Sequence, residues 1–251
     1  MDRPRVCITG STQGIGRAIA EAFLRSGARV VINAHLPDDG TAAELGHLGE
    51  CHFVQADLAT VAGAQDLVNA AHARLGRLDT LVNNAGSFHD VDFADLDQAR
   101  FDQTFNLNVR GYLFAAQAFA AVVTPEQTNP AIICVGSTNA LAAEKNSVIY
   151  DASKGAVLML VRSLAVTLAA RGIRVNGIGP GIVDTPLTHA NLAVSGVRDR
   201  LTAQIPLGRI AQPADIGGAA VFLAGAEATY ITGQMLYIDG GILANQTTWD
   251  I

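Results

Sequence analysis

Short unbroken apolar runs alternate along the chain with longer segments in which apolar residues recur every three or four positions. An unbroken run of about four to eight apolar residues is typical of a strand buried on both faces, and the longer spacing is typical of a helix. The runs predict strands at residues 5–9, 29–34, 51–55, 80–83, 131–135, 173–178 and 234–239. The spaced segments predict helices at residues 16–26, 38–48, 61–75, 96–123 (broken near 106–108), 152–170 and 213–225.

This alternation predicts an α/β fold, because helical crossovers join parallel strands and cover both faces of their sheet. We expect a Rossmann-type doubly wound parallel sheet of about seven strands in a three-layer α/β/α arrangement. No linker, repeat or low-complexity tract interrupts the 251 residues. The pattern therefore predicts one domain spanning residues 1–251.

Charge and composition narrow the function classes. The net charge is −6 and no basic run occurs, which argues against nucleic acid and anionic membrane as partners. The start lacks a signal-peptide pattern, and Arg162 interrupts the longest apolar stretch short of the roughly 20 residues of a membrane span. The three cysteines indicate small buried hydrophobes in a reducing compartment, so we expect a cytoplasmic protein. The six histidines show no metal-ligand spacing, and no metal site is expected.

The first predicted strand leads into a glycine-rich turn that opens the first helix. Glycines permit a tight bend and close backbone approach, and the N–H groups and dipole of a helix N-terminus attract a pyrophosphate. The turn predicts a dinucleotide site formed by Gly10, Thr12, Gln13, Gly14, Ile15 and Gly16.

The end of the second strand bears on which dinucleotide binds. An acidic residue there would bind the adenosine ribose and favour NAD, but Ala34 stands at this place. A 2′-phosphate then meets no repulsion, so we favour NADP(H), with NAD(H) as the alternative. The only candidate cations for the 2′-phosphate are Arg17 and His35. His35 is only partly charged near neutral pH, and its alternative interpretation is a solvated loop residue.

Polar residues also follow the third and fourth strands, at the edge where parallel sheets bind ligands. Asp57, next to Leu58, either accepts the adenine amino group or caps the following helix. The run of Asn84, Ala85 and Gly86 suits a bound ribose. All five are predicted to contact the dinucleotide.

Tyr150 and Lys154 are four residues apart and share a face if the segment is helical. A lysine ammonium near a phenol favours the phenolate and lowers the tyrosine pKa below its reference value of about 10. A tyrosine with such a pKa donates and accepts protons near neutral pH, which predicts a general acid/base. A chance pairing on a helix is the competing interpretation of these two residues alone.

Together these motifs resemble the short-chain dehydrogenase/reductase family, in particular its 3-oxoacyl reductase-like branch. The resemblance extends from Arg5 to Gly241. It rests on the turn at 9–16, Asn83-Asn84-Ala85-Gly86, Asn108-Val109 with Gly111, Ser137, Tyr150 with Lys154, Pro180-Gly181 ahead of Thr185, and the segments 206–209, 231–234 and 239–241. It implies an NAD(P)(H)-dependent oxidoreductase that interconverts a carbonyl compound and a secondary alcohol by hydride transfer.

The resemblance implies roles for single residues. Tyr150 would be the general acid in reduction and the base in oxidation, and Lys154 would hold the nicotinamide ribose and lower the Tyr150 pKa. Ser137 would bind the substrate oxygen, and Asn108 would position a water that links Lys154 to solvent, unless Asn108 only kinks its helix. The nicotinamide side would be lined by Pro180, Gly181, Val183 and Thr185. The substrate side would be lined by Ser137, Asn139, Tyr150 and Leu187, with Leu141 and Asn146 nearby.

The sequence leaves the small-molecule substrate open. The family places a substrate lid at about 187–207. Its 3-oxoacyl-thioester branch docks an acidic acyl carrier protein, yet residues 124–130 contain no Lys or Arg, which leaves Arg171. A sugar or polyol dehydrogenase is the alternative, and a non-catalytic nucleotide-binding protein is the remote one. The family is usually a homotetramer, and Trp249 in the tail either packs on a neighbouring subunit or is a loose end.

Overall fold

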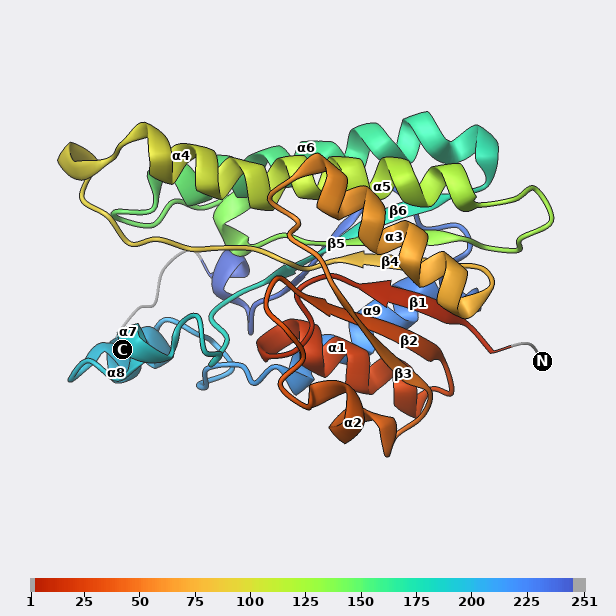
Figure 1. Ribbon diagram of the computed structural model, residues 1–251. Coiled ribbons are helices and arrows are strands. Elements are labelled where there is room, and N and C mark those ends of the chain that lie inside the picture. The colour runs from red at the N-terminus through yellow and green to blue at the C-terminus, as the bar shows by residue number, and fades with distance from the viewer. Residues whose placement is uncertain (1–2, 246–251) are drawn as a thin grey trace.

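The computed structural model describes residues 3–245, and within them seven strands form one parallel sheet (Figure 1). The strands are β1 (Arg5–Ile8), β2 (Arg29–Ala34), β3 (Cys51–Gln55), β4 (Thr80–Asn83), β5 (Ala131–Val135), β6 (Arg174–Pro180) and β7 (Met235–Ile238). Their order is β3-β2-β1-β4-β5-β6-β7, and every neighbouring pair is parallel. From β1 to β3 successive strands are added on one side of the sheet, and from β4 to β7 they are added on the other side. Doubly wound sheets bind ligands at the point between β1 and β4 where this order switches.

Helices cover both faces of the sheet and give the three layers expected from the sequence (Figure 1). One face carries α1 (Gly14–Arg25), α2 (Thr41–Gly46) and α9 (Ala214–Ala224). The other carries α3 (Val61–Leu75), α4 (Gln98–Phe105), α5 (Gly111–Val122) and α6 (Val148–Leu168). Two short helices, α7 (His189–Leu192) and α8 (Val197–Ala203), lie beyond the sheet edge. The Rossmann-type prediction is confirmed.

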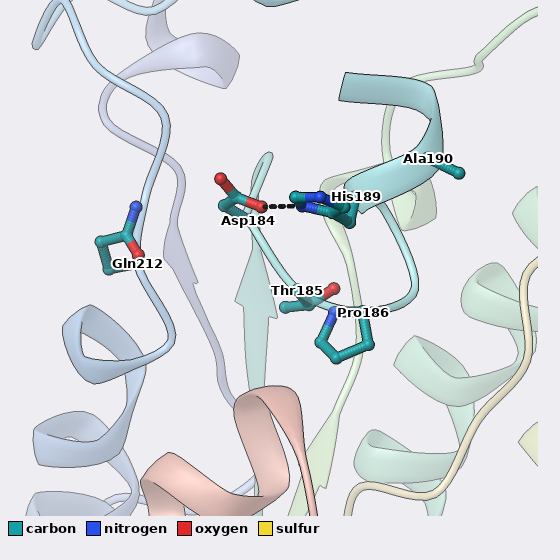
Figure 2. A pocket seen from close by; sticks show the side chains of 6 residues that line it. All are labelled: Asp184, Thr185, Pro186, His189, Ala190 and Gln212. Carbon is teal, nitrogen blue, oxygen red and sulfur yellow. Dashed lines mark ion pairs between the residues drawn. The ribbon is translucent and has the colours of Figure 1, made fainter. Parts of the chain in front are cut away.

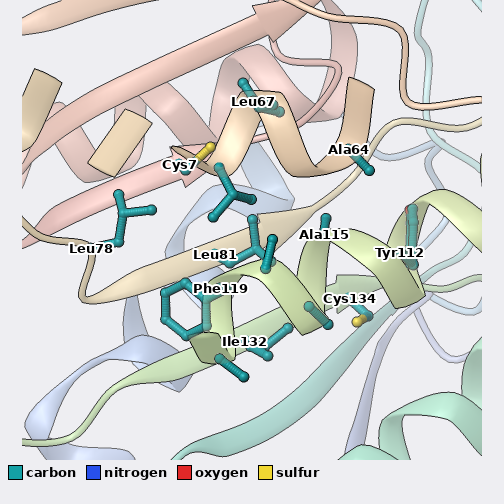
Figure 3. Close-up of a cluster of buried hydrophobic side chains, with 14 of the residues drawn as sticks. Cys7, Ala64, Leu67, Leu78, Leu81, Tyr112, Ala115, Phe119, Ile132 and Cys134 are labelled. Atoms are coloured by element: carbon teal, nitrogen blue, oxygen red, sulfur yellow. The ribbon is translucent and has the colours of Figure 1, made fainter. Parts of the chain in front are cut away.

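Two apolar cores, one on each face, hold the layers together. Figure 3 shows the first, where Leu81 of β4, Ile132 of β5 and Phe119 of α5 lie in one cluster, all fully buried. Strands β4 and β5 are buried along their whole length, which explains their unbroken apolar runs. Burying large apolar side chains contributes about 1.5–3 kcal/mol each to stability, so these strands add strongly to the stability of the fold.

The helix ends differ most from the sequence expectation at α2 and α6. Helix α2 is shorter than the predicted 38–48, because Asp38 and Asp39 accept hydrogen bonds from backbone N–H groups of its first turn and precede it. Helix α6 begins at Val148, four residues earlier than predicted, so Tyr150 lies on its first turn. The predicted break near 106–108 is confirmed as a π-helical turn, Asn106–Arg110, between α4 and α5.

Helix α6 also bears on the membrane question. Together with the turn after it, Val148–Arg171, it is long and apolar enough to cross a bilayer by length and composition alone. This segment still contains Arg162, the charged residue that interrupts its apolar run. Core helices of soluble proteins pass the same test, and Val157, Val161 and Ala165 of α6 pack against the sheet.

Candidate active site

The carboxyl ends of β1 and β4 meet at the glycine-rich turn. Gly10 has a φ of +58°, and a Cβ there would come within 2.7 Å of the Ala85 Cα. A Cβ on Gly16 would collide with the Gly10 carbonyl oxygen and the Asn84 side-chain amide. Glycine is therefore required at both positions by the close packing of the turn on the β4 end.

The N-terminus of α1 is suited to a pyrophosphate. Gln13 is its N-cap residue, and its side chain does not cap the helix in the described part of the chain. The first N–H groups of α1 thus remain available to phosphate oxygens, and the helix dipole favours negative charge there. The turn geometry fits a dinucleotide.

Two buried polar residues that the sequence analysis left out position this turn. Asn33 of β2 accepts a hydrogen bond from the Gly10 N–H and donates to the carbonyl oxygens of Val54 and Ala56, which ties the ends of β1, β2 and β3 together. Thr9 Oγ1 accepts from the backbone N–H groups of both Asn84 and Ala85. A polar residue at the end of an otherwise apolar strand run was the available sequence signal.

The predicted adenosine side contains few cations. Ala34 is half-buried at the end of β2, and His35 is exposed. The Arg17 guanidinium is held by Glu44, at 2.9 Å, and by Glu21, at 3.2 Å. Arg17 therefore already has two carboxylate partners in this structure.

The two interpretations of Asp57 are separated by the structure. Thr60 caps α3, because its Oγ1 accepts from the Gly63 N–H at 3.0 Å. Asp57 accepts from the Ala59 N–H and is exposed, so the helix-capping interpretation was wrong. Leu58 beside it is buried in the core.

Ser137, Tyr150 and Lys154 come together between β5 and α6. Ser137 follows β5, and its hydroxyl lies near enough to the Tyr150 phenol to influence the pKa of that phenol. The Lys154 Nζ is buried under the Tyr150 ring, 5.5 Å from its centroid, and donates to the Val135 carbonyl oxygen at 3.0 Å. Phe88, which the sequence analysis did not single out, packs edge-on against the Tyr150 ring with centroids 5.1 Å apart.

The pKa expectation for Tyr150 was wrong for this structure. Burial raises the pKa of Tyr150 to about 12, and the negative charges of Glu144 and Asp151 add to the rise, while the hydrogen bond with Ser137 opposes it. Burial also lowers the pKa of Lys154 to about 8. Desolvation disfavours both charged forms, so the pair as it stands holds a protonated phenol, the form that a general acid needs.

Asn108 lies in the π-helical turn and is fully buried. Its amide donates to the Ser87 carbonyl oxygen at 3.0 Å and to Ser153 Oγ at 3.1 Å, and its Oδ1 accepts from the Ser87 N–H at 2.9 Å. Ser153 in turn donates to the Tyr150 carbonyl oxygen. Asn108 thus links the segment after β4 to the first turns of α6 through Ser153.

Asn139 joins Ser137 to two carboxylates. Its backbone N–H donates to Ser137 Oγ, and its Oδ1 accepts from that hydroxyl, both at 3.1 Å. Its Nδ2 donates to Asp151 at 2.7 Å and to Glu144 at 3.2 Å. The predicted substrate-side residue is therefore hydrogen-bonded next to the catalytic candidates, whereas Leu141 and Leu187 are exposed.

The predicted nicotinamide side follows β6. Gly181 lies so close to β7 that a Cβ would come within 2.8 Å of the Asp239 Cα. Val183 is buried, and Thr185 shares a hydrogen bond with Thr188. Figure 2 shows the neighbouring open hollow of about 590 Å³, which is lined by Asp184, Thr185, Pro186, His189, Ala190 and Gln212.

The segment after this hollow contains α7 and α8. Leu192, Ile205 and Ile210 form a small apolar cluster of their own beneath these helices. Arg198 of α8 is ion-paired with Asp184 at 2.7 Å. Trp249 lies outside the described residues. Among residues 3–245, no group of three His, Cys, Asp or Glu side chains could hold a metal ion.

The lowered pKa of Lys154 predicts a pH-dependent contribution to stability. Its pKa is about 8 in the folded protein and 10.5 ordinarily, so between these values the unfolded chain holds a proton that the folded chain has released. Lys154 therefore makes the free energy of unfolding rise with pH in this window. Between about pH 7.5 and about pH 9.5, we expect the free energy of unfolding of the wild type to rise by about 2 kcal/mol relative to that of a Lys154→Met variant. Urea unfolding of both proteins measures this, and a difference that stays constant with pH would contradict it.

Comparisons with known proteins agree with this arrangement. A family model described as enoyl-(acyl carrier protein) reductase matches residues 10–243. L-rhamnose 1-dehydrogenase (NAD(P)(+)) of Azotobacter vinelandii is 37% identical over 247 residues, which cover 96% of each chain. A putative 2-deoxy-d-gluconate 3-dehydrogenase of Agrobacterium tumefaciens with bound NADP has a TM-score of 0.90 at 32% identity, with 98% of each chain covered.

A third similar structure is the 3-oxoacyl-[acyl-carrier protein] reductase of Brucella melitensis in complex with NAD. Its TM-score is 0.93 at 29% identity, and the match covers 98% of this chain and 100% of that one. One of the two similar structures holds NADP and the other NAD, and the names of the three proteins give different substrates. The chain therefore belongs to the short-chain dehydrogenase/reductase family, and it is an NAD(P)-dependent oxidoreductase that acts on alcohols and carbonyl compounds.

Proposed function

We propose that Tyr150 is the general acid/base of this oxidoreductase and that Ser137 and Lys154 act with it. The observation that carries the proposal is the junction between β5 and α6, where Ser137 at the end of β5 and Tyr150 on α6 lie beside the buried Lys154 ammonium, which is 5.5 Å from the Tyr150 ring centroid. A bound nicotinamide supplies the hydride in reduction and accepts it in oxidation. The chain supplies position and the proton.

In the reductive direction, Ser137 and Tyr150 both donate to the carbonyl oxygen of the substrate. The raised pKa of Tyr150 keeps the phenol protonated until the oxygen develops negative charge and takes the proton. Lys154 donates one N–H to the Val135 carbonyl oxygen. Its other N–H groups would bind the nicotinamide ribose and stabilise the phenolate. Asn108, whose amide bridges Ser87 and Ser153, would position a water that connects this lysine to solvent.

The dinucleotide would lie along the carboxyl ends of the strands. The α1 N-terminus and the glycine turn would hold the pyrophosphate, with Asn84, Ala85 and Gly86 at the ribose and Asp57 and Leu58 at the adenine. Pro180, Gly181, Val183 and Thr185 would hold the nicotinamide side, and the segment 187–207 would close over the substrate. This assignment is supported by the close approach of Gly10 and Gly16 to the β4 end.

The proposed substrate is a sugar or polyol. Residues 124–130 contain no basic residue for an acidic carrier protein, and the nearby Arg171 donates to the carbonyl oxygens of Ala120 and Val123 at the end of α5. The similarity to a rhamnose dehydrogenase supports the same choice. The test is a panel of sugars, polyols and ketones assayed by the absorbance of reduced nicotinamide. Cofactor binding without turnover of any compound would contradict the proposal.

We further propose that NADP(H) is preferred over NAD(H), because Ala34 offers no carboxylate to the adenosine ribose. An Ala34→Asp variant should bind NADPH at least about tenfold more weakly, since the new carboxylate repels the 2′-phosphate, while NADH binding is kept or improved. Fluorescence titration with both cofactors measures the change. Ala34→Asn is the matched control without charge, and equal weakening of NADPH binding in both variants would refute the charge argument.

Copies of the chain are proposed to assemble as a homotetramer in the cytoplasm. Large apolar side chains are exposed on the outer helices, namely Phe101 on α4, Leu113 on α5, and Met159 and Val166 on α6. Val166 is 81% exposed, and an apolar stripe of this kind is typical of a surface covered by another subunit. Sedimentation velocity measures the assembly.

A further inference from the structure

Two carboxylates stand beside the proposed catalytic serine, connected to it by a chain of hydrogen bonds. Asp151 follows Tyr150 in the sequence and accepts from Asn139 Nδ2 and from the Glu144 N–H, one bond to each carboxylate oxygen. Glu144 accepts from the same Nδ2 through its Oε2. Asn139 bonds Ser137 on its other side. We call Asn139, Glu144 and Asp151 the Asn139 cluster.

The negative charge of the Asn139 cluster is not neutralised. Within residues 3–245, neither Glu144 nor Asp151 has a basic side chain within ion-pair distance, although Lys145 follows Glu144 directly. Some carboxylates elsewhere in the described chain do have such partners, for example Glu44 with Arg17 and Asp184 with Arg198. The cluster therefore presents two uncompensated negative charges.

The field of these charges reaches the reacting atoms. Asp151 follows Tyr150 on the first turn of α6, and Asn139 links both carboxylates to Ser137. Their negative charges add to the rise in the pKa of the Tyr150 phenol. Lys154, whose ammonium is 5.5 Å from the centroid of the Tyr150 ring, is buried and donates to the Val135 carbonyl oxygen. Glu144 is exposed and has one carboxylate oxygen without a partner in the described residues, so it can accept a further hydrogen bond.

We propose that the Asn139 cluster makes this site selective for neutral hydroxylated substrates and against carboxylates. Glu144 accepts hydrogen bonds from substrate hydroxyl groups next to the reacting carbon, and the two negative charges repel an anionic substrate. The inference rests on the proposed function and narrows its substrate class to uncharged sugars and polyols. On this inference the substrate differs in charge from the sugar acid in the name of one similar structure, the putative 2-deoxy-d-gluconate 3-dehydrogenase.

The experiment compares pairs of compounds that differ in one carboxylate. Suitable pairs are D-sorbitol with D-gluconate, D-glucose with D-glucuronate, and ethyl acetoacetate with acetoacetate. For each pair that is turned over, we expect the kcat/KM of the neutral member to exceed that of the anion by about tenfold or more. In a Glu144→Gln/Asp151→Asn double variant, the ratio of the two kcat/KM values should fall to about threefold or less, because the kcat/KM of the anion rises.

The matched control is Glu126→Gln/Glu227→Gln, which removes the same two charges from exposed positions far from Ser137 and should leave the gap unchanged. Raising the ionic strength should also narrow the gap in the wild type, which tests the idea without any variant. A wild type that prefers the anion, or a gap unchanged by salt and by the double variant, overturns the inference while the proposed function stands. Cofactor binding with no turnover of any pair overturns both.

Discussion

A Tyr150→Phe variant should lose activity by about a thousandfold in kcat while remaining folded and able to bind the dinucleotide. The substitution removes only the phenolic oxygen, and a general acid/base contributes about 10²–10⁴ in rate. The ring itself stays, so its edge-on contact with Phe88 and its place above Lys154 are kept. Steady-state kinetics together with a cofactor titration measure both quantities.

Tyr230→Phe is the matched control, because Tyr230 is fully exposed and the same oxygen is removed there. It should keep wild-type kcat. A folded Tyr150→Phe protein with wild-type turnover would falsify the assignment of Tyr150, and loss of cofactor binding in this variant would show that the effect is on binding and not on proton transfer.

A Gly16→Ala variant should lose about 2–4 kcal/mol of unfolding free energy and most of its dinucleotide affinity. The added Cβ would collide with the Gly10 carbonyl oxygen and the Asn84 amide. Either the turn moves or α1 does, and both displace the N–H groups proposed to hold the pyrophosphate. We therefore expect the dissociation constant of NADPH to rise by more than tenfold.

Gly218→Ala on α9 supplies the comparison, since a Cβ there meets no atom within 4 Å. It should leave stability unchanged or raise it by up to about 1 kcal/mol, because alanine is the better helix former. Urea unfolding and fluorescence titration of both variants separate the steric effect from the general cost of replacing glycine. Equal behaviour of the two variants would contradict the close-packing argument.

Much of the fold was predictable from local patterns. Parallel strands buried on both faces carry unbroken apolar runs, which is why β4 and β5 were placed with the correct bounds. The break near Asn108 was also predicted, and it is the π-helical turn. Boundaries were less predictable at α2, where Asp38 and Asp39 bond to the first turn from outside the helix.

Residues whose role depends on contacts across the sheet were not predictable. Asn33 joins three strand ends, and Phe88 packs against Tyr150, which is far along the chain. Asp151 lies next to Tyr150 in the sequence, but only the folding of the loop after β5 brings Asn139 and Glu144 to it. Spacing along one chain segment carries no information about such distant partners.

The sequence by itself determined the layered α/β architecture, the glycine turn and the spacing of Tyr150 and Lys154, because these follow from apolar periodicity and from residues near in the chain. Only the tertiary structure decided the protonation preference at that pair. Four-residue spacing predicted a lowered tyrosine pKa, yet burial raises the pKa of Tyr150 to about 12 and lowers that of Lys154 to about 8. The physical reason is that desolvation depends on all the atoms packed around a group, and these come from several strands and helices.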